Sequence, residues 1–230
     1  MKLGVLTVLF QDRPLDVALA TLQKLGVQAV ELGAGGYPGN AHCDPAQLLH
    51  NPQAIKAYKQ KIADHGLIIS ALSCHGNPLH PNKDMADSYD RSYRDTVNLA
   101  SEMEVPVVNL FSGCPGDSEG SKYPNWVTCA WPPDFEEVLR WQWDEKVIPY
   151  WQEAGAFAQN AGVKLAFEMH PGFVVYNPET LLKLRQAVGP VIGANYDPSH
   201  LFWQGIDAVA SIHYLTGALH HFHAKDTYID

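Results

Sequence analysis

The sequence predicts an α/β protein, and within that class a parallel (β/α) TIM-type barrel, on three observations. Short β-branched runs alternate with longer amphipathic stretches along all 230 residues. Several of these runs alternate polar and apolar residues, and no break in composition divides the chain. Strands that alternate with helices form right-handed βαβ units and a parallel sheet. We therefore expect a single barrel domain over residues 1–230.

Seven strands are expected, separated by helix-like segments. The strand candidates are residues 3–9, 28–33, 67–73, 105–111, 163–169, 191–197 and 219–225. The helix candidates are residues 14–25, 51–65, 84–103, 134–161, 178–188 and 203–216. Asn51-Pro52 and Asn177-Pro178 are typical of helix starts, and Gly66 and Gly162 are typical of helix ends.

The polarity of the strands favours a barrel over an open doubly wound sheet. In the fifth strand, Glu168 and His170 share one face while Phe167 and Met169 share the other. Helices cover both faces of a doubly wound sheet, so these polar groups would be buried there at a cost of several kcal/mol. A barrel closes with eight strands, so we expect the eighth to be missing from a C-terminally incomplete chain or to be supplied by another chain.

Composition excludes several classes of function. The chain has 16 Lys and Arg against 25 Asp and Glu, a net charge of −9, which disfavours nucleic acid as a partner. Four scattered cysteines without a CxxC pair predict neither a disulfide framework nor a zinc knuckle, and they fit the reducing cytoplasm. The apolar run 3–10 is too short to span a membrane. We expect a cytoplasmic protein with a small-molecule substrate and no membrane partner.

Polar side chains gather at the C-terminal ends of the predicted strands, where barrel enzymes carry their chemistry. The candidates are Glu31, His75, Asn109, Glu168, His170, Asp197, His200, His223, Lys225 and Asp226. Glu168, Asp197 and His223 end three successive strands, which lie about 4.8 Å apart, so they can converge on one ion. Two carboxylates and an imidazole suit Mn²⁺, Mg²⁺, Co²⁺ or Zn²⁺. His200 can reach a substrate oxygen or the metal.

Each candidate also has an ordinary structural interpretation. A lone strand-end carboxylate is usually a solvated loop residue, and a lone strand histidine is usually a satisfied core group. For His220 and His221 we expect packing or hydrogen bonding rather than metal binding. Lys225 is equally well explained as the ion-pair partner of Asp226 or Glu168.

The longest irregular segment, residues 112–133, follows the fourth strand on the side of the candidate site. Long loops in compact domains are usually functional or mobile. Trp126 and Trp131 lie in it, and aromatic faces stack on sugar C–H surfaces. We interpret the segment as a lid or specificity loop, with simple covering of the barrel mouth as the alternative.

Five runs resemble the xylose-isomerase-like TIM barrel superfamily of sugar isomerases and epimerases. They are AFEMHPG (166–172), NYDPSHL (195–201), HFHAKD (221–226), VELGAGG (30–36) and SCHGNPLHP (73–81). The resemblance implies a divalent metal, Mn²⁺ foremost, held by Glu168, Asp197, His223 and a second glutamate. That glutamate is expected from the eighth strand and has no counterpart in this sequence.

The resemblance further implies an isomerase or epimerase of a small sugar, keto-sugar or polyol that works through a metal-bound enediolate. Glu168 is then both ligand and acid/base. Together with the strand-end and loop positions above, the candidate substrate-binding residues are His200, Lys225, His75, Glu31, Asn109, His170, Trp126 and Trp131. Three alternatives stay open: an inosose-dehydratase-like lyase, an apurinic-site endonuclease of the same superfamily, and a non-catalytic barrel module. A barrel with an open edge is expected to be covered by further residues or a partner, so a homo-oligomer also stays open.

Overall fold

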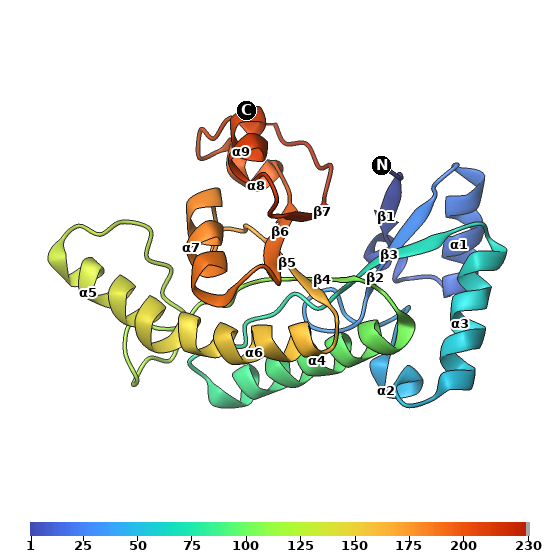
Figure 1. Ribbon diagram of the computed structural model, residues 1–230, viewed down its shortest axis with the longest axis horizontal. Helices are drawn as coiled ribbons and strands as arrows, with labels where there is room; N and C mark the ends of the chain where they lie inside the picture. The colour runs from blue at the N-terminus through green and yellow to red at the C-terminus, as the bar shows by residue number, and fades with distance from the viewer. Residues whose placement is uncertain (229–230) are drawn as a thin grey trace. The chain divides into compact units, whose positions relative to one another are not determined.

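The computed structural model describes residues 1–228 (Figure 1). Its contacts divide the chain into two compact units, and each is described by itself. Unit 1 comprises Met1–His75, Arg91–Asn109 and Ala161–Val163, and unit 2 comprises Gly76–Asp90, Leu110–Asn160 and Lys164–Asp230.

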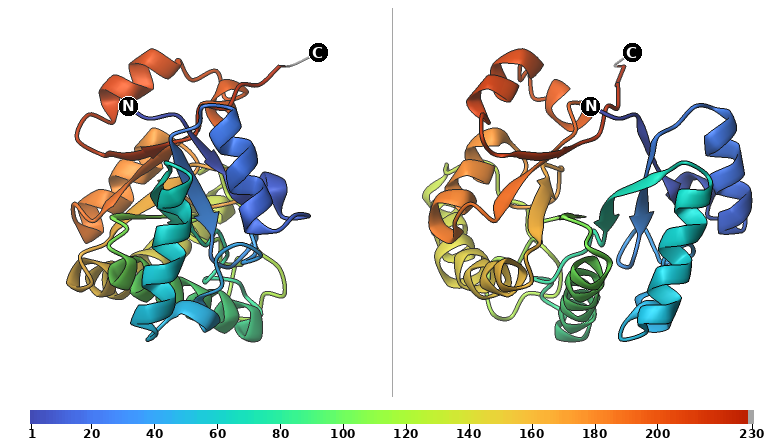
Figure 2. Two further views of the ribbon diagram at one scale, coloured as in Figure 1. Left: turned by 90° about the vertical axis from the view of Figure 1, so that its right-hand side faces the viewer. Right: turned by 45° about the vertical axis from the view of Figure 1, so that its right-hand side comes forward.

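Unit 1 holds a parallel sheet of order β1-β2-β3-β4. Its strands are β1 (Gly4–Leu6), β2 (Ala29–Gly33), β3 (Ile68–Ser73) and β4 (Val107–Leu110), the last up to Asn109. Its helices are η1 (Thr7–Phe10), α1 (Leu15–Lys24), α2 (Pro45–Leu48), α3 (Pro52–Asp64) and, from Arg91 on, α4 (Lys83–Met103). Figure 2 shows α3 running alongside this sheet, and the helix buries Ile55 and Ile62.

Unit 2 holds a parallel sheet of order β5-β6-β7. Its strands are β5 (Lys164–Glu168), β6 (Ile192–Tyr196) and β7 (Leu219–Phe222). Its helices are α5 (Pro133–Trp141), the π-helix η2 (Gln142–Val147), α6 (Ile148–Asn160), α7 (Pro178–Val188), α8 (Ser199–Phe202) and α9 (Ala208–Tyr214). Helix α6 packs on β5 and α7, so the helices cover one face of the strands.

The structure confirms the fold class. Seven parallel strands appear in chain order from β1 to β7, and helices connect them as in a TIM-type α/β barrel. The strand β5 alternates as predicted: Phe167 is fully buried and packs edge-on against Trp151 of α6 at 4.7 Å, whereas Glu168 belongs to the opposite face. The prediction of one domain over residues 1–230 stays a prediction.

The predicted helix starts are confirmed at two positions. The Asn51 side chain accepts a hydrogen bond from the Ala54 N–H at 3.0 Å, and Pro52 is the first residue of α3. Asn177 and Thr180 form a capping box at the start of α7, where the Thr180 N–H donates to Asn177 Oδ1 at 2.9 Å. Such caps satisfy backbone N–H groups that have no partner within the helix.

Several element boundaries were predicted wrongly, among them the end of the seventh strand, which lies at Phe222 and not at residue 225. The first strand ends at Leu6 because residues 7–10 turn into a 3₁₀ helix. The expected single helix over 134–161 contains the π-helical turn η2, which shifts its register between α5 and α6. The last expected helix, 203–216, begins only at Ala208, because Gly205 adopts a φ of +72° and Asp207 caps α9.

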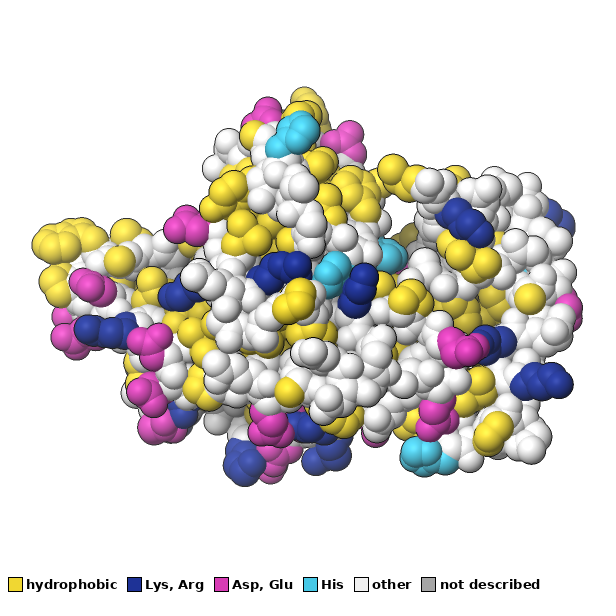
Figure 3. Space-filling model, in the orientation of Figure 1, with side chains coloured by type: hydrophobic (Ala, Val, Ile, Leu, Met, Phe, Trp, Pro, Cys, Tyr) yellow, Lys and Arg dark blue, Asp and Glu magenta, His cyan; other side chains and the backbone are white. Residues whose placement is uncertain are grey.

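Apolar side chains gather on the surface of unit 2 over α8, α9 and β7 (Figure 3). The exposed members are Phe202, Trp203, Val209, Tyr214, Leu219 and Phe222. Among the described residues, no helix has the length and apolar character that crossing a bilayer requires.

Candidate functional site

Three strand ends of unit 2 place the candidate side chains. Glu168 is the last residue of β5, Asp197 directly follows β6, and His223 directly follows β7. The strands are parallel, with Glu168 paired to Asn195 and Tyr196 paired to Phe222, so their carboxyl ends meet at one edge of the sheet. The predicted ligands therefore gather at one edge of unit 2.

Glu168 is the centre of this cluster. Its residue is only 6% exposed, and its two carboxylate oxygens face different partners. Oε1 lies 3.0 Å from His200 Nε2, while Oε2 lies 3.2 Å from His223 Nδ1. Oε2 also accepts a hydrogen bond from Asn195 Nδ2 at 3.2 Å. A buried carboxylate between two imidazoles is a typical arrangement of acid/base and metal sites.

One carboxylate oxygen of Asp197 is hydrogen-bonded to Ser199, and the other faces the cluster. Oδ1 accepts hydrogen bonds from the Ser199 N–H at 2.9 Å and the Ser199 hydroxyl at 2.6 Å. Oδ2 lies 2.9 Å from Lys225 Nζ and 3.4 Å from His200 Nε2. This oxygen is buried and makes no well-aligned hydrogen bond in the described part of the chain. A buried carboxylate oxygen in that condition is suited to a cation.

The donor atoms of Glu168, Asp197 and His200 all lie within 4.8 Å of one another. Two carboxylates and one imidazole with donor atoms this close together fit a hard or borderline divalent cation. The sequence named His223 as the imidazole of this group. The structure places His223 against Glu168 Oε2 and places His200 beside both carboxylates, so two imidazoles flank the pair.

His170 lies behind His200. The ring centroids of the two histidines are 4.1 Å apart, and Phe111 packs on His170 at 4.9 Å. His170 Nδ1 lies 2.7 Å from the Pro171 carbonyl oxygen, which fixes Nδ1 as the protonated nitrogen. Burial lowers the pKa of His170, so its ring is held neutral. Its Nε2 can then accept a hydrogen bond from a hydroxyl group.

Lys225 forms an ion pair, as its structural interpretation predicted. Its partner is Asp197, however, and not the expected Asp226 or Glu168. His220 and His221 each lie within hydrogen-bond distance of an oxygen atom. His220 Nδ1 lies 3.1 Å from the Leu165 carbonyl oxygen, and His221 Nδ1 lies 3.2 Å from Asn195 Oδ1.

Asn195 is the residue that sequence reasoning did not select. Its side chain contacts Glu168, His221 and His223, so it ties β5, β6 and β7 together beneath the cluster. The sequence could have identified it, because side-chain alternation along the sixth strand puts Asn195 on the same face as Asp197.

Unit 1 holds three candidates, and one of them, Glu31, is a second buried carboxylate. Glu31 is 3% exposed, and its Oε1 accepts hydrogen bonds from Asn109 Nδ2 at 2.8 Å and from the Ser73 hydroxyl. His75 follows β3, is 5% exposed, and accepts a hydrogen bond from the Tyr37 N–H at its carbonyl oxygen. Unit 1 thus has a cluster of hydrogen-bonded polar side chains, Glu31, Ser73 and Asn109, on the adjacent strands β2, β3 and β4.

The long loop of unit 2 is anchored at its base. Gln142, the first residue of η2, donates to the Gly116 and Asn125 carbonyl oxygens at 2.9 and 2.7 Å. Trp126 packs edge-on against Tyr176 at 5.4 Å and near Trp203 at 6.4 Å, whereas Trp131 is 73% exposed. The two tryptophans therefore have different surroundings: Trp126 packs among aromatic side chains, and Trp131 faces solvent.

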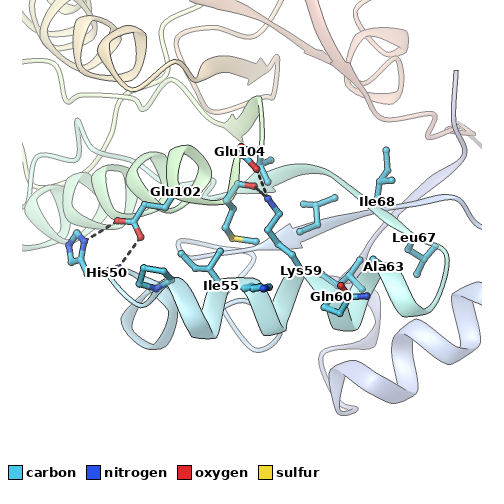
Figure 4. Close-up of a pocket in the computed structure, with 15 residues that line it drawn as sticks. His50, Ile55, Lys59, Gln60, Ala63, Leu67, Ile68, Glu102 and Glu104 are labelled. Atoms are coloured by element: carbon cyan, nitrogen blue, oxygen red, sulfur yellow. Dashed lines mark hydrogen bonds and ion pairs between the residues drawn. The ribbon is translucent and has the colours of Figure 1, made fainter.

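A cavity of about 780 Å³ lies in unit 1, between α3 and the end of α4 (Figure 4). Lys59 spans it, donating to the Met103 carbonyl oxygen at 2.7 Å and pairing with Glu104 at 2.9 Å. It opens beside Leu67 and Ile68, where β3 begins, and none of the predicted site residues lines it. In barrels that end of the strands serves stability rather than chemistry.

Comparison with known proteins identifies the family. The profile of the family described as "Xylose isomerase-like TIM barrel" matches residues 19–230. The uncharacterized protein YfiH of Bacillus subtilis (strain 168) is 37% identical over 237 residues, which cover 100% of this chain and 74% of that protein.

Two solved structures show the same fold at low identity. The probable 3-DHS dehydratase AsbF from Bacillus anthracis superposes with a TM-score of 0.68 at 16% identity, covering 96% of this chain and 72% of that one. A D-psicose 3-epimerase solved in the presence of D-fructose gives a TM-score of 0.66 at 12% identity, with the same coverage, 96% and 72%. On the family profile and the Bacillus subtilis relative, the chain belongs to the xylose isomerase-like TIM barrel family.

Proposed function

We propose that this protein is a divalent-metal-dependent isomerase or epimerase of a small sugar, keto-sugar or polyol. The observation that carries the proposal is the convergence of Glu168, Asp197 and His200 within 4.8 Å at the carboxyl ends of adjacent strands. The fold it shares with a D-psicose 3-epimerase supports the same substrate class. We also place the protein in the cytoplasm, in line with its free cysteines.

A divalent cation fits the donor set of this cluster. Glu168, Asp197 and His223 are the ligands that the sequence predicts, and His200 offers a further nitrogen within reach of both carboxylates. The buried Asp197 Oδ2, without a well-aligned hydrogen bond, supports a cation at this position. When bound, the metal supplies Lewis-acid polarisation of the substrate's oxygens, and Mn²⁺ is the first candidate.

The chain's own residues carry out the proton transfer. In an isomerisation, Glu168 removes the proton from the carbon next to the substrate carbonyl and returns it to the other carbon of the enediolate. Epimerisation needs a second proton donor on the opposite face, the role that the family resemblance gives to the second glutamate. Asn195 and His223 hold Oε2 of this carboxylate, which fixes the direction of Oε1. A base held in one orientation is effective because it loses little freedom when the substrate arrives.

Substrate oxygens are bound by the polar groups around Glu168. His170, neutral and packed on Phe111, accepts a hydrogen bond from a substrate hydroxyl group at Nε2, and His200 and Lys225 contact further oxygens. The sequence also assigns substrate binding to Trp126 and Trp131 in unit 2 and to Glu31, His75 and Asn109 in unit 1, and these assignments stay predictions.

A lyase is the second candidate, favoured by the fold shared with the probable dehydratase AsbF. Dehydration begins with the same removal of a proton next to a carbonyl. It differs in the next step, where a hydroxyl group on the neighbouring carbon leaves as water and a double bond forms. The two candidates therefore share Glu168 and differ in their products.

One experiment tests both. The purified protein is freed of metal by chelation, reloaded with Mn²⁺, and incubated in D₂O with a panel of ketoses and keto-polyols. An isomerase or epimerase is expected to incorporate deuterium next to the carbonyl and to form a new sugar, both seen by NMR. A lyase is expected to form an unsaturated product. Absence of exchange and of product across the panel, with Mn²⁺ bound, would contradict the proposal.

A further inference from the structure

Lys225 reaches into the cluster from the segment after β7. Its Nζ lies 2.9 Å from Asp197 Oδ2 and 3.1 Å from His200 Nε2. These are two of the three donor atoms that converge within 4.8 Å. Its side chain is 53% exposed, whereas that of Asp197 is 1% exposed, so a flexible, solvent-reaching cation neutralises a buried anion.

Asp197 can offer the ammonium only one oxygen. Oδ1 is occupied by the backbone and side chain of Ser199, which act as a local cap on the turn into α8. Oδ2 is the remaining donor, and its neighbours are Lys225 Nζ and His200 Nε2. Any cation that binds Asp197 from within the cluster therefore uses the atom that Lys225 contacts.

An ammonium and a divalent ion cannot share these two atoms. Divalent ions bind carboxylate and imidazole donors at about 2.0–2.6 Å, closer than an ammonium approaches. With both on Oδ2 and Nε2, the two positive charges would lie within a few ångströms of each other in a largely buried site, where repulsion is strong.

We propose that Lys225 is an internal counter-ion of this site, which a divalent cation displaces when it binds Asp197 and His200. The inference rests on the proposed function in one respect, that a divalent cation is the ligand of the cluster. Displacement turns the ammonium toward solvent and incoming substrate, so metal binding also presents a positive group to substrate oxygens. Lys225 thus lowers the affinity of the site for metal and, once displaced, is available to substrate oxygens.

The test is Mn²⁺ titration of chelator-treated protein by calorimetry. Lys225→Met keeps the length of the side chain and removes its charge, and we expect it to bind Mn²⁺ about tenfold more tightly than wild type. Lys225→Arg keeps the charge and is expected to stay close to wild type. The matched control is Lys164→Met, because Lys164 is exposed at the start of β5, at the opposite end of the strand from Glu168. Circular dichroism checks that each variant is folded.

A second readout separates displacement from a general effect of charge. Acetylation of lysines, followed by mass spectrometry, measures how freely each ammonium reacts. Saturating Mn²⁺ is expected to raise the labelling rate of Lys225 about threefold, because the free energy of a partly exposed ion pair corresponds to a factor of this order. The labelling rate of Lys164 is expected to stay unchanged.

The outcomes distinguish this inference from the proposed metal dependence. Equal Mn²⁺ affinity in wild type and Lys225→Met, or a labelling rate of Lys225 that does not rise with Mn²⁺, overturns the inference and leaves the metal site standing. Mn²⁺ binding by Lys225→Met alone supports it, because the ammonium then outcompetes the ion in wild type. Binding by neither protein overturns both.

Discussion

The two units each bury a strand-borne glutamate, and within its own unit each carboxylate has different hydrogen-bonding partners. Glu31 of unit 1 and Glu168 of unit 2 are 3% and 6% exposed. Within its own unit, Glu31 accepts hydrogen bonds from a hydroxyl and an amide, Ser73 and Asn109. Glu168 instead lies between the imidazoles of His200 and His223. Within its unit, Glu168 thus has partners that gain and lose protons or bind metal, which are the kind that tune a buried carboxylate.

The largest expected effect separates these two glutamates. Glu168→Gln removes the proposed base while keeping its size, so deuterium exchange into a ketose substrate should fall about 10³-fold. Glu31→Gln should retain at least about a tenth of the exchange, because its proposed role is to hold substrate oxygens rather than to move protons.

Exchange rates measured with Mn²⁺ at saturation check this difference, with circular dichroism to confirm folding. Near wild-type exchange in Glu168→Gln would remove Glu168 from the acid/base role. A 10³-fold loss in Glu31→Gln would mean that the two carboxylates work as a pair.

A smaller effect is expected at Asn195, which orients Glu168 without being a proton carrier. Asn195→Ala leaves Glu168 Oε2 and His221 without their amide partner, so we expect a loss of about 1–3 kcal/mol in the free energy of unfolding. Exchange should drop about tenfold, since the carboxylate loses its fixed direction. Urea denaturation and the exchange assay measure the two changes, and an unchanged exchange rate would show that Asn195 only supports the fold.

The sequence predicted those parts of the fold that depend on local patterns. Asn177-Pro178 predicted the start of α7, and the alternation around Phe167 and Glu168 predicted which side of β5 is buried against helices. The 3₁₀ turn at Thr7–Phe10 could not be predicted, because its β-branched and apolar residues continue the pattern of the strand before it. The residue at which a strand stops pairing with the adjacent strand cannot be predicted from its local sequence pattern.

The site was predicted to the extent that it follows strand order. Parallel strands bring their ends together, so the contact between Glu168 and His223 followed from spacing. The place of His200 beside both carboxylates depends on the turn that Ser199 and Asp197 form at the start of α8, which spacing does not specify. The contact between Glu31 and Ser73 depends on a register shift after Val30, which is a property of paired strands and not of either strand alone.

The smallest expected effect tests whether the two units unfold together. Asn51→Ala removes the cap of α3 in unit 1, and Asn177→Ala removes the cap of α7 in unit 2. Each should lower stability by about 1 kcal/mol, because each leaves a backbone N–H at the helix start without its side-chain acceptor.

The form of the urea transition then decides between two descriptions of the chain. If the units form the single domain predicted from the sequence, both variants shift one shared transition by similar amounts. If each unit is cooperative by itself, Asn51→Ala shifts one transition and Asn177→Ala shifts the other. Tryptophan fluorescence reports on unit 2 specifically, because all six tryptophans belong to it, while circular dichroism reports on both. Coincident curves from the two probes in both variants would establish one cooperative domain, and separated curves would show that the proposed site of unit 2 lies in an independently folding part of the chain.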